Sequence, residues 1–76
     1  MIELWGSDDC EACNKAREFL GRTPLEWKYV DVATINFEGQ IPRLILEDGT
    51  NIVDLPAIES YVSHWMKEMG FPEGMI

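Results

Sequence analysis

The sequence predicts a small α/β domain with one four-stranded mixed sheet, and three observations lead to this expectation. A strand, a helix and a second strand fit within residues 2–32, so the chain starts with a β-α-β unit. A hairpin signal follows at residues 43–53, and an amphipathic helix pattern follows the hairpin. The predicted order is therefore β-α-β, a connection, then β-β-α. With 76 residues, the chain is expected to form a single domain, residues 1–76.

The β-α-β unit is predicted because the spacing of apolar residues changes along the sequence. Residues 2–5 are short and apolar, as in a buried strand, and turn-forming residues follow them. A helical period begins at Cys10, and its expected apolar face consists of Ala12, Ala16, Phe19 and Leu20. Gly21 is expected to end this helix in the left-handed conformation. Residues 26–32 then form a second strand, parallel to the first.

The second half begins with residues 33–40, which can hold one helical turn but no long helix. Asp48-Gly49 lies between two apolar runs and predicts a hairpin turn.

The last helix is expected to begin at a cap near Asp54, with Pro56 in its first turn, and to end at Gly70. Its apolar face is expected to contain Ile58, Tyr61, Val62, Trp65, Met66 and Met69. The tail, residues 71–76, is expected to pack loosely.

The composition argues against several classes of partner. Six basic residues face 14 acidic ones, which gives a net charge of −8, and the basic residues form no cluster for nucleic acid. No apolar run approaches the roughly 20 residues that span a bilayer. Residues 1–6 lack the features of a signal peptide, so a cytoplasmic monomer without membrane contact is expected.

The two cysteines, Cys10 and Cys13, form a C-x-x-C pair at the expected start of the first helix. Residues three apart on a helix have Cα atoms roughly 5 Å apart, within the span of a disulfide. The unpaired N–H groups and the dipole at a helix start favour a thiolate, so Cys10 is the expected nucleophile and Cys13 the resolving thiol. Asp8, Asp9 and Glu11 oppose the thiolate through their charge. A C-x-x-C beside a β-α-β unit indicates a thioredoxin-like redox motif.

A metal site is the alternative use of such a pair. A structural zinc site needs four ligands, and the chain offers one C-x-x-C and a single histidine, His64. His64 is expected at the surface of the last helix, so no metal site is predicted within one copy. Zinc shared between two copies remains the open alternative.

Several motifs together resemble those of glutaredoxins, especially the compact phage and bacterial kind, over nearly the whole chain. They are Trp5-Gly6, Cys10-Glu11-Ala12-Cys13, Ile41-Pro42-Arg43, Asp48-Gly49 and the segment 51–62. The resemblance implies a thioredoxin-like, glutaredoxin-type fold in which the second helix is reduced or absent. It also implies a cis peptide between Ile41 and Pro42, and substrate contacts by Trp5, Ile41, Pro42, Asp54 and Leu55. From the residues alone, Trp5 could equally be a core aromatic, and Pro42 a trans proline opening an edge strand.

Three departures from the family weaken its glutathione site. The first is Glu11, which adds charge after the first cysteine. The second lies before and within the last helix, where Val53-Asp54 replaces a Gly-Gly pair and Pro56 replaces an aspartate. Asp54 would repel a carboxylate, and Pro56 has no N–H to donate. The connection at residues 33–40 also lacks the family's second helix, which often supplies a basic residue.

The expected function is therefore that of a dithiol–disulfide oxidoreductase that reduces protein disulfides through Cys10 and Cys13. By resemblance, a ribonucleotide reductase is the leading candidate substrate. No bound cofactor is expected, and the external reductant is either glutathione or a thioredoxin reductase. Two alternatives stay open: a thioredoxin-fold binding module without turnover, and a dimer that binds a metal or cluster through its cysteines.

Overall fold

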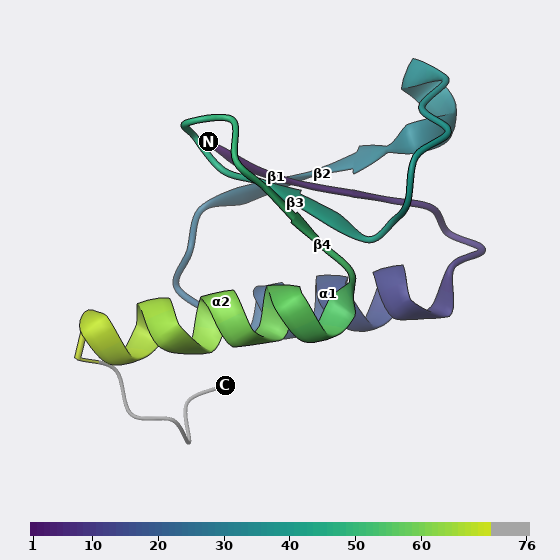
Figure 1. Cartoon of the computed structure of the whole chain (residues 1–76). Helices are drawn as coiled ribbons and strands as arrows, with labels where there is room; N and C mark the ends of the chain where they lie inside the picture. Colours follow the sequence, from purple (N-terminus) through teal and green to yellow (C-terminus); the bar gives the residue numbers. More distant parts are fainter. Residues whose placement is uncertain (71–76) are drawn as a thin grey trace.

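A computed structural model describes residues 1–70 and confirms the predicted order of elements (Figure 1). The elements are β1 (Ile2–Gly6), α1 (Glu11–Gly21), β2 (Trp27–Asp31), the 3-10 helix η1 (Val32–Ile35), β3 (Arg43–Ile45), β4 (Asn51–Val53) and α2 (Leu55–Glu68). The single helical turn expected in the connection is η1. The loose packing expected of residues 71–76 lies outside the described residues.

The four strands form one mixed sheet in the order β2-β1-β3-β4. β1 and β2 are parallel, as the β-α-β pattern predicts, whereas β1–β3 and β3–β4 are antiparallel. Leu4 in the middle of β1 lies opposite Tyr29 of β2 and Leu44 of β3. Because side chains alternate along a strand, these three point to one face, and Trp5 points to the other.

Both helices cover the same face of the sheet, and the core lies between the two layers (Figure 1). The core cluster takes side chains from both layers, each at most 1% exposed, and consists of Leu4, Ala16, Leu20, Leu44, Ile58, Val62 and Met66. The opposite face has no α-helix over it within residues 1–70, because the connection between β2 and β3 contains only η1. Over the same residues, no helix combines the length and apolar composition that crossing a membrane requires.

Two expectations about turns are confirmed. Gly49 takes φ +90° in the hairpin, where the carboxylate of Asp48 accepts the Thr50 N–H at 2.9 Å. Gly70 takes φ +86° directly after the C-cap of α2. Glycine is suited to both places because it adopts positive φ without a side-chain clash.

The expected left-handed end of α1 at Gly21 is wrong. Gly21 is the last helical residue, and the cap is Arg22 with φ −93°. The free carbonyl of Leu20 accepts both the N–H of Thr23 at 3.0 Å and its hydroxyl at 2.7 Å. A side chain therefore satisfies the helix end, and no left-handed residue is needed.

The apolar helix faces are also shifted from the predicted ones. In α1 the buried residues are Cys13, Ala16 and Leu20, whereas Ala12 and Phe19 are only half-buried. Met69 was expected on the apolar face of α2, but it is 59% exposed. Met69 is the C-cap of α2, and the end of α2 extends past the strands in Figure 1.

Candidate functional site

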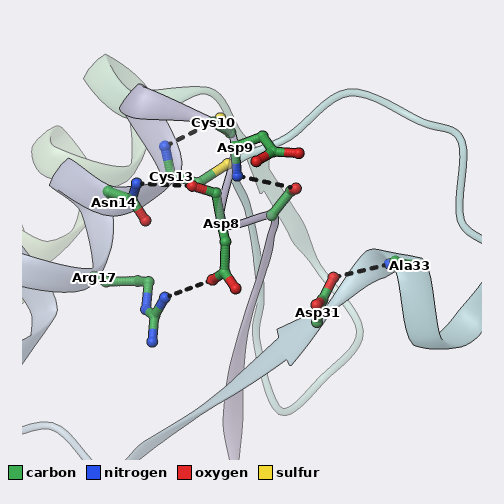
Figure 2. Close-up of polar contacts among 9 residues, drawn as sticks. Asp8, Asp9, Cys10, Cys13, Asn14, Arg17, Asp31 and Ala33 are labelled. Carbon is green, nitrogen blue, oxygen red and sulfur yellow. Dashed lines mark hydrogen bonds and ion pairs between the residues drawn. The ribbon is translucent and has the colours of Figure 1, made fainter.

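The cysteine pair lies where β1 passes into α1. The N–H of Cys10 donates to the carbonyl of Ser7 at 3.1 Å, which closes the turn between the two elements. Cys10 is the N-cap of α1 with extended backbone, and its sulfur accepts the N–H of Cys13 at 3.2 Å (Figure 2). The nucleophile expected from the sequence is therefore half-exposed at the positive end of the helix dipole, as that role requires.

Cys13 is one turn further along and fully buried. Burial, followed by a hydrogen bond to Cys10, raises the pKa of the Cys13 thiol from 9.0 to about 11. Desolvation disfavours the charged form of the thiol, so Cys13 keeps its proton at neutral pH. The Cys10 sulfur contacts the backbone N–H of Cys13, and the two thiols differ in access to solvent, which is the asymmetry that a nucleophile and a resolving thiol need.

Gly6 brings α1 close enough to the sheet for this contact. A Cβ atom at Gly6 would lie 2.9 Å from the Cβ and 3.1 Å from the sulfur of Cys13. No side chain fits in that space, so Cys13 packs directly on the backbone of β1. Sequence reasoning placed Gly6 only in a turn, and the resemblance only noted a small residue there. Its packing role requires knowledge of the helix position.

The acidic residues around Cys10 are partly neutralised by cations of α1. Asp8 forms an ion pair with Arg17 at 3.2 Å, and Glu11 pairs with Lys15 at 3.5 Å (Figure 2 shows the first pair). These pairs are exposed and contribute at most about 1 kcal/mol each to stability. Their local effect is to offset two of the negative charges that oppose a thiolate at Cys10.

The segments around Pro42 and Asp54 form a second part of the site. The Ile41–Pro42 peptide bond is cis, as the resemblance implied, and Pro42 is fully buried whereas Ile41 is half-buried. Arg43 lies opposite Trp5 in the antiparallel pair, so Pro42 comes next to Gly6, which touches Cys13.

The carbonyl of Pro42 accepts the N–H of Asp54 at 2.9 Å, which ties this segment to the start of α2. Asp54 adopts φ +80° and ψ 151°, a region that side chains rarely occupy. Its carboxylate accepts the N–H of Leu55 at 2.8 Å and caps α2. Asp54 and Leu55 are therefore joined in one helix cap, and a negative charge already occupies it.

Trp5 lies on the sheet face away from the helices. Its ring meets Phe37 edge to face, with the ring centres 5.0 Å apart, and its Nε1 donates to Glu3 at 2.9 Å. The guanidinium of Arg43 lies 5.1 Å from the centre of the Phe37 ring. The structure thus places Trp5 in an aromatic contact with the connection before β3. Phe37 was not singled out from the sequence, because an isolated aromatic in a short connection carries no periodic signal.

Tyr29 is a further residue that sequence reasoning missed. It comes from β2, and the guanidinium of Arg17 lies 3.9 Å from the centre of its ring. A ring carbon of Tyr29 would lie 3.4 Å from a Cβ at Gly6, so the ring reaches the same place as Cys13. In sequence it reads only as one apolar-facing position of a strand.

His64 lies on the surface, as expected, and its Nε2 is 3.0 Å from the carboxylate of Glu68. Across residues 1–70, no three His, Cys, Asp or Glu side chains gather in a way that could hold a metal ion. Comparisons with protein-family models, with curated proteins and with solved structures found no match to this chain.

Proposed function

We propose that this protein is a thiol–disulfide oxidoreductase with a thioredoxin-like fold of the glutaredoxin type. The observation that carries the proposal is the pair at the start of α1. The half-exposed Cys10 sulfur caps the helix by accepting the N–H of Cys13, and the Cys13 thiol is fully buried one turn further along. The order of strands and helices supports the assignment through the motifs that resemble glutaredoxins.

The reaction takes place in two steps. The Cys10 thiolate attacks one sulfur of a substrate disulfide, so that a mixed disulfide forms and the first substrate thiol leaves and takes up a proton. Cys13 then loses its proton and attacks the Cys10 sulfur, which releases the second substrate thiol. Two electrons pass from the dithiol to the substrate, and the protein is left with a Cys10–Cys13 disulfide. Glutathione or a thioredoxin reductase restores the dithiol.

Different residues of this chain have different parts in the proposed reaction. The N–H of Cys13 in the first turn of α1 donates to the Cys10 sulfur, which places the attacking sulfur at the positive end of the helix dipole. Gly6 holds Cys13 within reach of Cys10 without a side chain between helix and strand. The backbone at Ile41 is the proposed contact for an extended substrate chain, in the manner of an added strand.

The proposed substrate class is a protein disulfide, with a ribonucleotide reductase as the leading candidate by resemblance. The Asp54 carboxylate already accepts the first N–H of α2, so a substrate carboxylate would meet a like charge there. This argues against tight binding of glutathione. A reducing compartment such as the cytoplasm suits a protein whose resting state is the dithiol.

The experiment that tests this function is turnover of a small neutral disulfide, hydroxyethyl disulfide. Two assays run in parallel, one with glutathione and its reductase and one with thioredoxin reductase, both coupled to NADPH oxidation. We expect turnover in at least one assay and its loss in Cys10→Ser. Absence of turnover in both assays, with the protein folded and reduced, would refute the enzyme and favour a binding module.

One observation favours that second candidate. The sheet face opposite the helices carries half-buried apolar side chains, among them Val30, Ile45 and Val53, with no α-helix over them within residues 1–70. Such a face is a candidate surface for protein contacts. It can coexist with the redox function, and it replaces that function only if turnover is absent.

A further inference from the structure

The hydroxyl of Tyr29 is an unusual feature beside the cysteines. Among the described residues it is a buried side-chain oxygen without a hydrogen-bond partner, although the ring itself is only half-buried. Buried hydroxyls nearly always find a partner, and an unpaired one destabilises the folded state. The unused hydroxyl therefore calls for a functional explanation.

The position of Tyr29 links it to the resolving thiol. Tyr29 lies opposite Leu4 on β1, on the face of the sheet that the helices cover. A Cβ at Gly6 would lie 3.1 Å from the Cys13 sulfur and 3.4 Å from Cε1 of Tyr29, so sulfur and ring edge border the same gap. Arg17, one turn after Cys13 on α1, covers the ring with its guanidinium at 3.9 Å from the ring centre. The ring is thus held between strand and helix at the edge of the Cys13 site.

Four titratable groups act on the pKa of the Tyr29 phenol. They are Arg17 on α1, Asp8 in the loop before α1, Asp31 on β2 and Cys13 itself. Burial is the largest effect and raises the pKa of Tyr29, while Arg17 acts in the opposite direction. At neutral pH the hydroxyl is therefore able to donate a hydrogen bond, and it has no acceptor within residues 1–70.

We propose that Tyr29 is a positioning residue for the resolving step, and that its hydroxyl donates a hydrogen bond to the Cys13 thiolate when that thiolate forms. In the resting dithiol, the Cys13 thiol bonds to Cys10 and offers no negative charge to Tyr29. Once Cys10 is bound in the mixed disulfide, Cys13 must give up its proton inside a buried site. A thiolate there needs a donor, and the unpaired hydroxyl supplies one.

This inference rests on the proposed function and refines its second half. In the resolving step the Cys13 proton leaves with the departing substrate thiolate, the Cys13–Cys10 bond forms, and the Cys10–substrate bond breaks. Tyr29 keeps its own proton throughout and changes no redox state. Its contribution is the stabilisation of a charge that appears only during the reaction, which is how a fixed dipole accelerates a step.

The test follows the two steps separately with a dipyridyl disulfide in a stopped-flow spectrometer. The first thiopyridone is released by Cys10 and the second by Cys13, and the variant is Tyr29→Phe, which keeps the ring and the Arg17 contact. We expect the second phase to slow about tenfold near pH 7, as loss of a hydrogen bond to a charged group predicts, while the first phase changes less than about twofold. The pH profile of the second phase should shift to higher pH. The matched control is Tyr61→Phe in the middle of α2, which lines a pocket with Ile2 at the opposite end of β1 from Gly6 and should change neither phase.

A stability measurement separates this role from simple packing. Because Tyr29→Phe removes an unpaired buried hydroxyl, the urea midpoint of the reduced protein should stay the same or rise. A lower midpoint, equal slowing of both phases, or an unchanged second phase and pH profile would overturn the inference and leave the oxidoreductase intact. A wild-type protein that releases only one thiopyridone would instead refute the proposed two-step function.

Discussion

The two helices begin on the same side of the molecule, toward the end of β1, but their first turns are capped by different chemistry (Figure 1). At α1 the cap is the sulfur of Cys10, with the Cys13 N–H at 3.2 Å. At α2 the cap is the carboxylate of Asp54, with the Leu55 N–H at 2.8 Å and a backbone at φ +80°. A neutral thiol is a weak acceptor, whereas a carboxylate forms a strong, charge-assisted bond.

Because of this difference, the start of α1 suits the proposed reaction, whereas the start of α2 stabilises its helix. The sulfur cap is the weaker of the two and contributes about 1 kcal/mol, so Cys10 can leave it to attack a disulfide without unfolding α1. The carboxylate cap fixes the entry to α2 and places negative charge there, which disfavours anionic ligands. The two helix starts thus differ in chemistry: a half-exposed sulfur lies at the start of α1, and a carboxylate lies at the start of α2.

The largest effect on disulfide reduction should come from replacing Cys10, the N-cap of α1. Cys10→Ser is expected to abolish disulfide reduction, because no nucleophile remains at the exposed position. Its stability should stay within about 0.5 kcal/mol of the wild type, since serine is itself a good N-cap. Cys10→Ala should also be inactive and lose about 1 kcal/mol, because it has no cap acceptor. Hydroxyethyl disulfide turnover and urea unfolding measure the two effects, and residual turnover in Cys10→Ser would contradict the role of Cys10.

The next effect concerns the contact between α1 and the sheet. Gly6→Ala places a Cβ 2.9 Å from the Cβ of Cys13, so backbone must move, and we expect a loss of about 1–3 kcal/mol in unfolding free energy. The matched control is Gly21→Ala at the other end of α1, where nothing lies within 4 Å of the added atom. That change should stabilise the protein by about 0.5–1 kcal/mol. Equal effects of the two substitutions in urea unfolding would show that the close approach at Gly6 is not present.

The raised pKa of Cys13 predicts a pH dependence of stability. The unfolded thiol ionises near pH 9.0, whereas the folded thiol keeps its proton up to about pH 11. Above pH 9.0 the unfolded state therefore binds fewer protons, and stability falls as the pH rises through this window, by up to about 2 kcal/mol. Unfolding free energies at several pH values measure the decline in the reduced protein. Cys13→Ser should lack it, and an identical decline in both proteins would assign it to other groups.

The smallest predicted effect concerns Asp54, the N-cap of α2. Asp54→Gly relieves the backbone at φ +80° and loses only a few tenths of a kcal/mol as a cap, so we expect about 1 kcal/mol of net stabilisation. Asp54→Ala keeps the unfavourable backbone and loses the cap, and should destabilise by about 1 kcal/mol. Urea unfolding compares the pair. The rate with glutathione disulfide relative to hydroxyethyl disulfide should rise in Asp54→Gly, and a fall would show that this carboxylate does not repel the ligand.

The topology was predictable because local signals agreed with one another. The change of period at Cys10, the Asp48-Gly49 turn and the cap at Asp54 each depend on neighbouring residues, and the structure contains all three. The position of the cysteine pair follows from the same signals. Details that depend on distant contacts were harder to predict. The end of α1 at Arg22 uses the hydroxyl of Thr23, which competes with the left-handed glycine that the pattern favours.

The candidate site likewise combines features that were predictable from the sequence with features that were not. The spacing of Cys10 and Cys13 was visible in the sequence, whereas the close contact of Gly6 with Cys13 and the buried hydroxyl of Tyr29 arise only when β1, β2 and α1 come together. Nothing in a single sequence marks a glycine as a packing contact or a tyrosine as a buried hydroxyl. The resemblance implies that Trp5 contacts substrate. The alternation of side chains along β1 instead places Trp5 on the sheet face away from the helices, where its ring meets Phe37.

The most direct test of the central claim is mass spectrometry of the protein after reaction with an equimolar amount of hydroxyethyl disulfide. We predict a monomer that has lost two hydrogens, with the peptides of Cys10 and Cys13 linked to each other and released again by dithiothreitol. A stable hydroxyethyl adduct on Cys10 with Cys13 unreacted, or a dimer linked through Cys10, would contradict an intramolecular redox pair.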